Sequence, residues 1–169
     1  MNLRAALVLP LEEARLAELR ARFDPIGTAM GIPLHITLLF PFGRDEDGVE
    51  EFFASWSPLG FSLTRVAEFP AVLWLAPEPD DELRARILEL YARFRQWPPY
   101  GGEFPEPIPH ATVGKVPEGE SQADVAAAVR AAADPLLPVS FELREAALLA
   151  ESAPDRWYEV RRFAFRGGA

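Results

Sequence analysis

The apolar positions along the chain follow two different spacings, and together they predict a repeated order of secondary-structure elements. Short continuous apolar runs at residues 5–10 and 71–77 are typical of buried strands. Each run is followed by a segment whose apolar residues recur every three or four positions, at 11–23 and 80–94, which predicts an amphipathic helix. The inner faces of these helices are expected to consist of Leu16, Leu19, Phe23, Leu83, Ile87, Leu90 and Phe94.

A stretch rich in proline and glycine ends each of these helices, at residues 24–33 and 96–109. Beyond each stretch the pattern is again that of a strand, at 34–42 and 110–116. The order strand, helix, loop and strand therefore occurs twice. A repeat of this length indicates an internal duplication with two similar halves rather than a solenoid.

Further elements follow each copy in a similar order. They are a helix at 47–56 and a strand at 60–69 after the first copy, then a helix at 121–133 and strands at 139–151 and 156–165 after the second. The helix between the copies has one apolar face formed by Val49, Phe52, Phe53 and Trp56. At the start of the helix at 80–94, Asp80 or Asp81 is placed to cap the first backbone N–H groups.

Length and composition limit the class of protein. The 169 residues suit one domain, or two small lobes that share a core. The chain contains no cysteine, which excludes disulfides, thiol nucleophiles and cysteine metal ligands. No apolar run approaches the ~20 residues that a membrane-spanning helix needs, and the N-terminus lacks a signal-peptide pattern. We therefore expect a cytoplasmic protein that does not bind membranes.

The net charge of −9 limits the partners. An acidic chain is not expected to bind long nucleic acid through its backbone, because that affinity comes mainly from lysine and arginine contacts to phosphate. A nucleotide or a nucleic-acid end stays compatible, since a local pocket can be basic on an acidic surface. The only lysine is Lys115, five positions after the second histidine.

The chain contains only two histidines, and each lies in one of the two repeated strands. A threonine follows each histidine two positions later, which gives the pairs His35–Thr37 and His110–Thr112. Because residues i and i+2 of a strand point to the same face, each strand presents one imidazole and one hydroxyl on one side. The residues expected to point the opposite way, toward an apolar layer, are Ile36, Leu38, Phe40, Ala111 and Val113.

Two such pairs facing each other across a cleft supply the groups that acid–base attack at phosphorus needs. Histidine titrates near pH 6.5, so one ring can be neutral while the other is charged. The neutral ring accepts a proton from the nucleophile, and the charged ring donates a proton to the leaving oxygen. The threonine hydroxyls can hydrogen-bond the non-bridging phosphate oxygens. The sequence leaves open which histidine takes which role.

A two-histidine metal site is a competing interpretation of the same residues. Such a site predicts a nearby aspartate or glutamate as a further ligand. Neither histidine strand contains one. We therefore expect neither a metal nor a cofactor.

The paired His-x-Thr strands resemble those of the 2H phosphoesterase superfamily, which includes bacterial 2′-5′ RNA ligase-like proteins and RNA 2′,3′-cyclic phosphodiesterases. In that family an aromatic residue commonly lies five positions after the first histidine, here Phe40. A basic residue, usually arginine, lies at the same offset in the second motif, here Lys115. The aromatic segment at 156–165 is similar to the last strand of the family. An odd offset aims Lys115 away from His110 in a regular strand, which a bulge at Gly114 would correct.

The resemblance implies an α+β, bilobal fold in which two pseudo-twofold-related halves, each with an antiparallel sheet and helices, flank a central cleft. Residues 1–169 are then a single domain of two lobes, each with one His-x-Thr strand. The implied enzyme is a metal-independent phosphoesterase that acts on the 2′,3′-cyclic phosphate or 2′-5′ phosphodiester of RNA ends or nucleotides, in hydrolysis or ligation. His35 and His110 are the implied acid and base, and Thr37 and Thr112 orient the phosphate.

A function of another class is also compatible with these residues. A non-catalytic module could bind a nucleotide or RNA end in the same cleft without turnover. The two intact histidine–threonine pairs favour the enzyme, because binding alone does not require two proton-transfer groups.

Other side chains are candidates for substrate contact. Lys115 and Arg44 are candidates for binding phosphate, with solvated surface charge as the alternative. Stacking on a base, or else packing in the core, is expected of Phe40, Tyr158, Trp74 and Trp157.

Overall fold

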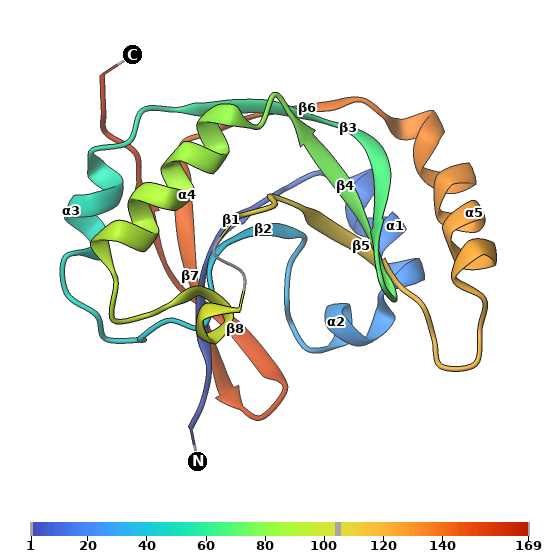
Figure 1. Cartoon of the computed structure of the whole chain (residues 1–169), viewed down its shortest axis with the longest axis horizontal. Helices are drawn as coiled ribbons and strands as arrows, with labels where there is room; N and C mark the ends of the chain where they lie inside the picture. Colours follow the sequence, from blue (N-terminus) through green and yellow to red (C-terminus); the bar gives the residue numbers. More distant parts are fainter. Residues whose placement is uncertain (1, 104–105, 169) are drawn as a thin grey trace.

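The structure is a computed structural model that describes residues 2–103 and 106–168. Eight strands form one antiparallel sheet in the order β6-β3-β4-β5-β2-β1-β7-β8, which curls around the middle of the molecule (Figure 1). The strands are β1 (Ala5–Pro10), β2 (His35–Leu39), β3 (Leu59–Phe69), β4 (Val72–Glu78), β5 (Ala111–Lys115), β6 (Val139–Leu143), β7 (Glu145–Ala153) and β8 (Arg156–Ala164).

The two histidine strands, β2 and β5, are neighbours at the centre of this sheet. On one side of the centre β2 is followed by β1, β7 and β8, and on the other β5 is followed by β4, β3 and β6. In each half the strand that opens the repeated unit, β1 or β4, lies directly beside the motif strand. The predicted α+β class is confirmed, with the antiparallel strands of both halves joined in a single sheet.

The helices cover the sheet on both sides of its centre, α3 and α4 together at one end and α1 and α5 at the other (Figure 1). Helix α1 packs against β5 and α4 packs against β2, so each contacts the histidine strand of the other half. Among the described residues, no helix is long and apolar enough to span a bilayer. The helices are α1 (Ala14–Phe23), α2 (Pro25–Ala29), α3 (Val49–Ala54), α4 (Asp81–Arg93) and α5 (Gln122–Ala133), with short 3₁₀ turns η1 (Pro99–Gly102) and η2 (Asp134–Leu136).

The helix faces predicted from the apolar spacing are buried in the main hydrophobic core. Leu83, Ile87, Leu90 and Phe94 of the α4 segment are at most 1% exposed. Leu16 and Leu19 of α1 are also buried, and Phe23 packs against the same core. Removal of this apolar surface from water is the main force that holds the helices on the sheet.

The segment at 24–33, predicted as a loop alone, contains the short helix α2. Asp24 starts this helix by accepting a hydrogen bond from the Gly27 N–H at 3.1 Å, and Pro25 occupies the first helical position. Proline suits that position because its missing N–H has no partner within the helix anyway. The expectation of an unstructured break was therefore wrong between Pro25 and Ala29.

The strand predicted at 139–151 divides at Arg144 into two strands with different partners. β6 pairs with β3 in one half of the sheet, whereas β7 pairs with β1 in the other. A continuous apolar pattern does not reveal such a change of partner. Asp80 occupies the N-cap position of α4 but makes no capping hydrogen bond, because its carboxylate accepts one from Arg84 Nε at 2.7 Å instead.

Candidate active site

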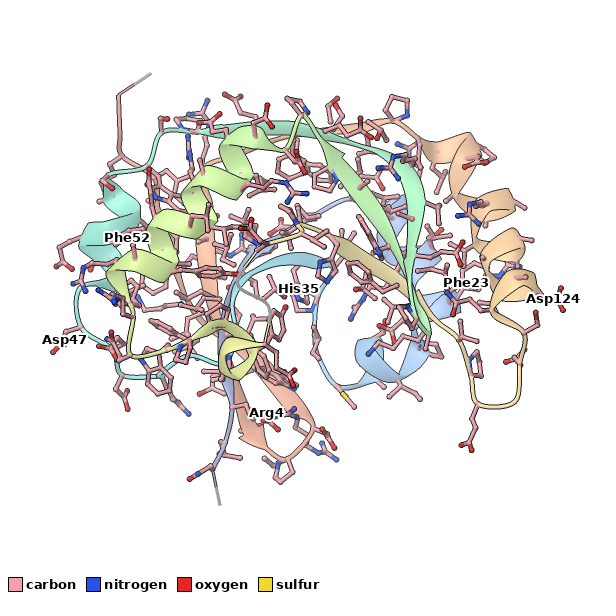
Figure 2. The ribbon with its side chains drawn as sticks, in the orientation of Figure 1. Arg4, Phe23, His35, Asp47, Phe52 and Asp124 are labelled. Atoms are coloured by element: carbon pink, nitrogen blue, oxygen red, sulfur yellow. The ribbon has the colours of Figure 1, made fainter. Side chains whose placement is uncertain are left out.

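The two histidine strands meet at one residue pair at the centre of the sheet. Ile36, which follows His35, pairs with Ala111, which follows His110, in antiparallel register. Both paired residues are fully buried in the core. Because side chains alternate between the faces of a strand, the two His-x-Thr pairs point together to the opposite face. Figure 2 shows His35 near the centre of the molecule.

Each histidine strand contains one extra residue, three positions after its histidine. The register between β1 and β2 shifts at this point, and so does the register between β4 and β5. The unpaired residues are Leu38 and Val113. Such bulges interrupt the alternation of side chains, and as a result Phe40 and Lys115 line the same cavity as His35.

The bulge predicted at Gly114 is therefore present, one residue earlier than expected. Gly114 itself faces the core, where a Cβ atom would contact Phe23 and Val129. The expectation that Phe40 points away from the histidine was wrong for the same reason, since the extra residue at Leu38 turns it back. Its placement beside the histidine agrees with its selection as a candidate contact residue.

Both imidazoles are held by the same kind of backbone contact. His35 Nδ1 lies 2.7 Å from the carbonyl oxygen of Pro33, and His110 Nδ1 lies 2.7 Å from that of Ile108. A carbonyl oxygen can only accept a hydrogen bond, so Nδ1 must carry the proton in each ring. The lone pair of each neutral ring is therefore on Nε2, the nitrogen that exchanges protons. His35 Nε2 lies 3.1 Å from the hydroxyl oxygen of Thr37.

The surroundings of both rings favour the neutral form. Burial lowers the pKa of His35 to about 4, although the Pro33 carbonyl acts in the opposite direction. The nearby charges of Arg20 and of protonated His110 lower this pKa further, whereas that of Asp24 raises it. The pKa of His110 is lowered as well, again mainly by burial. At neutral pH, both rings are therefore bases with their lone pair on Nε2.

A cavity of about 620 Å³ lies on the histidine face of the sheet. His35, Thr37 and Thr112 line it, together with Lys115 and Arg20. Lys115, two hydroxyls and an imidazole thus converge on one space and are suited to hold an anion such as a phosphate. Two carboxylates, those of Asp24 and Glu118, also line the cavity, and Asp24 pairs with Arg20 at 3.5 Å.

An aromatic wall closes one side of this cavity. The ring of Phe40 lies 6.1 Å from that of Tyr100 and 6.4 Å from that of Trp157. The buried apolar floor beside them is formed by Ala6, Val8, Ala147 and Leu149, a small cluster separate from the main core. An apolar recess next to an anion site is a suitable environment for a nucleobase.

His110 packs against two aromatic rings of its own half. The ring of Phe69 lies 5.0 Å away and that of Trp74 lies 5.8 Å away. Trp74 is paired with Thr112 in the sheet and is 8% exposed. Its indole Nε1 is buried without a hydrogen-bond partner among the described residues. Trp74 thus forms part of the apolar surroundings that lower the pKa of His110.

The remaining predicted contact residues lie elsewhere. Arg44 stacks over the ring of Tyr158 at 5.4 Å, and neither residue lines the cavity. Tyr158 packs against the main core, whereas the preceding residue, Trp157, packs against the small cluster on the cavity face. Strand alternation separates the two aromatic residues in this way. The structure therefore brings His35, Thr37, Thr112, Phe40 and Lys115 together around the cavity, but not Arg44 or Tyr158. His110 is not among the residues that line the cavity, although the residue after it, Ala111, pairs with Ile36 of the His35 strand.

Sequence reasoning did not single out Arg20 or Tyr100, which both line the cavity. Arg20 is only 6% exposed and pairs with Asp24 at 3.5 Å. The spacing of four residues between them is a signal for an ion pair on one helix face, but not for its position. Tyr100 belongs to the loop predicted at 96–109, and its hydroxyl interacts with Thr37. Burial nevertheless raises the pKa of Tyr100.

The described residues contain no group of three or more histidine, cysteine, aspartate or glutamate side chains that could hold a metal ion. Asp24, an acidic residue beside the cavity, uses its carboxylate to pair with Arg20 and to accept the hydrogen bond that starts α2.

Comparison with known proteins agrees with this architecture. A model of the 2′-5′ RNA ligase superfamily matches residues 7–155. No curated protein matches the sequence. Three solved structures illustrate the shared fold, and at these low identities they show the fold alone. The first is a phosphoesterase with 18% identity and a TM-score of 0.62, with 98% of this chain and 99% of that chain covered. The second is E. coli LigT complexed with 3′-AMP, with 17% identity and a TM-score of 0.59, with 96% of this chain and 98% of that chain covered. The third is TT0787 of Thermus thermophilus, with 20% identity and a TM-score of 0.53, with 98% of this chain and 100% of that chain covered.

Proposed function

The chain belongs to the 2′-5′ RNA ligase superfamily, and we propose that it is a metal-independent phosphoesterase. Its substrate is a 2′,3′-cyclic phosphate or a 2′-5′ phosphodiester on a nucleotide or an RNA end. His35, Thr37, His110 and Thr112 are the catalytic residues, within one domain of two lobes that spans residues 1–169. One observation supports this most directly: the residues that follow the two histidines, Ile36 and Ala111, pair with each other at the centre of the sheet. The carbonyl contacts of both Nδ1 atoms add to this support.

In hydrolysis of a cyclic phosphate, His35 acts as the base. Its low pKa keeps it neutral at pH 7, so Nε2 accepts a proton from the attacking water while the water oxygen bonds to phosphorus. The bond from phosphorus to one ribose oxygen breaks, and the charged form of His110 donates its Nε2 proton to that oxygen. The bound phosphate anion favours this charged form. One water is consumed, and proton exchange with solvent resets both rings.

The other cavity residues bind the substrate. The hydroxyls of Thr37 and Thr112 donate hydrogen bonds to non-bridging oxygens, where negative charge is concentrated. Lys115 adds a positive charge at the exposed side of the same cavity. Phe40 and Trp157 offer apolar surface for a base. E. coli LigT, which has the same fold, forms a complex with 3′-AMP, and this is consistent with a nucleotide substrate here.

The proposal is tested by incubating the protein with a nucleoside 2′,3′-cyclic phosphate in excess EDTA and measuring the monophosphate product. We expect turnover without added metal, and a loss of about 10²- to 10⁴-fold in His35→Ala and in His110→Ala. Both variants must retain the wild-type unfolding transition. A requirement for added metal would contradict the metal-independent mechanism. A cyclic mononucleotide, an oligonucleotide with a cyclic end and a 2′-5′-linked dimer, compared side by side, identify the substrate class.

A binding module is the second candidate, and the apolar recess beside the cations favours it as much as it favours the enzyme. It predicts saturable binding of a nucleotide to the wild type with no product from any of the three substrates. It also predicts that replacing either histidine changes affinity alone.

A further inference from the structure

Arg20 and Arg84 occupy equivalent places in the two halves of the molecule. Arg20 lies on α1 and Arg84 lies on α4, the helices that precede the two histidine strands. Each donates a hydrogen bond from Nη1 to a backbone carbonyl at 2.5 Å, Arg20 to Ile32 and Arg84 to Pro107. Ile32 and Pro107 both lie three residues before the histidine of their half.

The carbonyl that each arginine holds is adjacent to the carbonyl that each histidine uses. His35 Nδ1 contacts the oxygen of Pro33, the residue after Ile32. His110 Nδ1 contacts the oxygen of Ile108, the residue after Pro107. In both halves, therefore, an arginine holds one peptide group while the histidine ring docks on the next one.

The two arginines are themselves fixed by acidic residues of the same helix segments. Arg20 pairs with Asp24 at 3.5 Å, and Arg84 Nε donates to Asp80 at 2.7 Å. This second contact explains why Asp80 does not cap α4. A guanidinium held at both ends in this way has little freedom, so the carbonyl it binds is held in a defined position.

The loops need such an external contact because they contain proline. Proline has no backbone N–H, so Pro33 and Pro109 cannot donate to a neighbouring strand. The segments before the histidines therefore receive less support from the sheet than the strands that follow. A long cationic side chain from the preceding helix supplies the missing support.

We propose that Arg20 and Arg84 are matched positioning residues, which hold the two pre-histidine loops so that each imidazole keeps its proton on Nδ1 and its lone pair on Nε2. Neither arginine needs to contact the substrate for this role. The inference rests on the proposed function for its catalytic meaning, because only a proton-transfer mechanism requires Nε2 to be the proton-exchanging nitrogen in both rings.

The burial of Arg20 shows that its contact with the Ile32 carbonyl is not a solvent-exposed surface contact. It is 6% exposed, and Asp24 is 3% exposed. Burying a charge is costly unless it is paired and hydrogen-bonded, and Arg20 meets both conditions through Asp24 and the Ile32 carbonyl. Arg84 is half-exposed, with 38% of its side chain accessible, and therefore tolerates replacement more easily.

The two halves differ in one respect that supports distinct roles for the rings. The Arg20 charge contributes to the low pKa of His35. For His110, burial lowers the pKa and the Ile108 carbonyl raises it, with no charged group among the causes. Arg20 thus fixes the ring geometry of His35 and also favours its neutral form, whereas Arg84 acts on geometry only.

The tautomers can be measured directly, because the chain has only two histidines. Long-range proton–nitrogen NMR of ¹⁵N-labelled full-length protein at neutral pH reports which ring nitrogen carries the proton. We expect Nδ1–H in both wild-type rings. Arg20→Met should introduce the Nε2–H tautomer at His35 only, and Arg84→Met at His110 only. Arg20→Lys, which retains a donor and the charge, should restore most of the wild-type signal at His35.

Arg86 provides a matched control. It also lies on α4, is 7% exposed and donates to a carbonyl, that of Ser57 at 2.5 Å. That carbonyl is remote in sequence from both histidine loops. Arg86→Met should therefore lower stability without changing either tautomer. If Arg20→Met does not fold because Asp24 loses its partner, Arg84→Met still decides the matter through the tautomer of His110.

Activity on a nucleoside 2′,3′-cyclic phosphate gives the second readout. Arg20→Met and Arg84→Met should each lose about 100-fold in kcat with KM little changed, since misplacing a catalytic group by about 1 Å has effects of that size. Arg86→Met should retain the wild-type kcat. The NMR measurement uses no substrate, so an inactive wild type would overturn the proposed function alone. An unchanged tautomer at His110 in Arg84→Met or at His35 in Arg20→Met, or Nε2–H rings in the wild type, would overturn the positioning role.

Discussion

Gly31 and Trp157 touch through their backbones: Gly31 faces the carbonyl oxygen of Trp157 with a positive φ of 85°. Beside this contact, the backbone N–H of Trp157 donates a hydrogen bond to the carbonyl oxygen of Met30 at 2.7 Å. The end of the α2 segment is thereby joined to the β7–β8 hairpin. This junction helps to place the Trp157 ring in the wall of the cavity.

Gly31→Ala should destabilise the protein by about 3 kcal/mol. Roughly 1–2 kcal/mol comes from forcing a Cβ-bearing residue to a positive φ, and the rest from displacing the Trp157 backbone. Gly119→Ala is the matched control, because Gly119 has the same φ of 85° but nothing within 4 Å of an added Cβ. Urea unfolding of both variants measures the difference. Equal losses of stability would show that the contact with Trp157 contributes nothing.

The order of elements was predictable because each depends on local spacing. The stripe from Leu83 to Phe94 has helical periodicity and is buried as predicted. Likewise, one imidazole and one hydroxyl on each histidine strand follow from the two-residue period of a strand. These features need no knowledge of the partner to which a segment packs.

The structural features that the sequence patterns did not predict depend on contacts between segments that are distant in sequence. The bulges at Leu38 and Val113 exist only relative to the neighbouring strands β1 and β4. The odd offset of Lys115 predicts a bulge in the second strand, and Phe40 has the same offset in the first strand, where no bulge was predicted. The position of Arg20 beside His35 results from α1 packing on the far half of the sheet, which no local pattern records.

Arg44 and Tyr158 illustrate the opposite error. Both residue types are common in nucleotide sites, and their chemistry alone made them candidates. Strand alternation places the Tyr158 side chain against the main core and that of Trp157 against the cavity cluster. The choice between adjacent aromatic residues therefore depends on strand register, which local sequence does not determine.

Lys115→Met should raise KM for a nucleoside 2′,3′-cyclic phosphate by about fivefold with little change in kcat, because an exposed charge pair contributes up to about 1 kcal/mol. Lys115→Arg should retain wild-type KM. Arg166→Met, which removes an exposed cation near the C-terminus, is the control and should change neither constant. The effect of Lys115→Met should shrink in about 1 M salt, where the Debye length falls to about 3 Å. A KM that stays at the wild-type value in low salt would remove Lys115 from the binding site.

His35 should make the folded protein less stable as the solution becomes acidic. Its pKa is about 4 in the folded protein, against 6.5 for an ordinary histidine, so the unfolded chain binds more protons between these values. The free energy of unfolding is therefore highest above about pH 6.5 and falls as the pH drops toward 4. This contribution amounts to about 2 kcal/mol by about pH 4.5.

His35→Gln isolates this contribution, since glutamine does not titrate while His110 and the carboxylates titrate in both proteins. Urea unfolding at pH 7 and at about pH 4.5 should show the wild type losing about 2 kcal/mol more than the variant. Parallel losses in the two proteins would mean that His35 is not held in its neutral form.

Tyr100→Phe should lower kcat about three- to tenfold and leave the fold intact. The Tyr100 hydroxyl interacts with Thr37, whose own hydroxyl lies 3.1 Å from His35 Nε2. Before substrate binds, the Thr37 proton is directed to the unprotonated Nε2, and in the complex it turns to a non-bridging phosphate oxygen; in both states the Thr37 oxygen can accept from Tyr100. Loss of one neutral hydrogen bond of about 1 kcal/mol leaves Thr37 less well oriented, which corresponds to the expected change in rate.

Tyr91→Phe is the control for this substitution. Burial raises the pKa of Tyr91 to about 12, so Tyr91, like Tyr100, has a partly buried phenol group. Tyr91 lies on α4, however, and does not line the cavity. The ring of Tyr100 remains against Phe40 in its own variant, so binding of a base should be unchanged and the effect should appear in kcat rather than KM. A rise in KM with unchanged kcat would instead assign the hydroxyl to substrate binding and remove it from the orientation of Thr37.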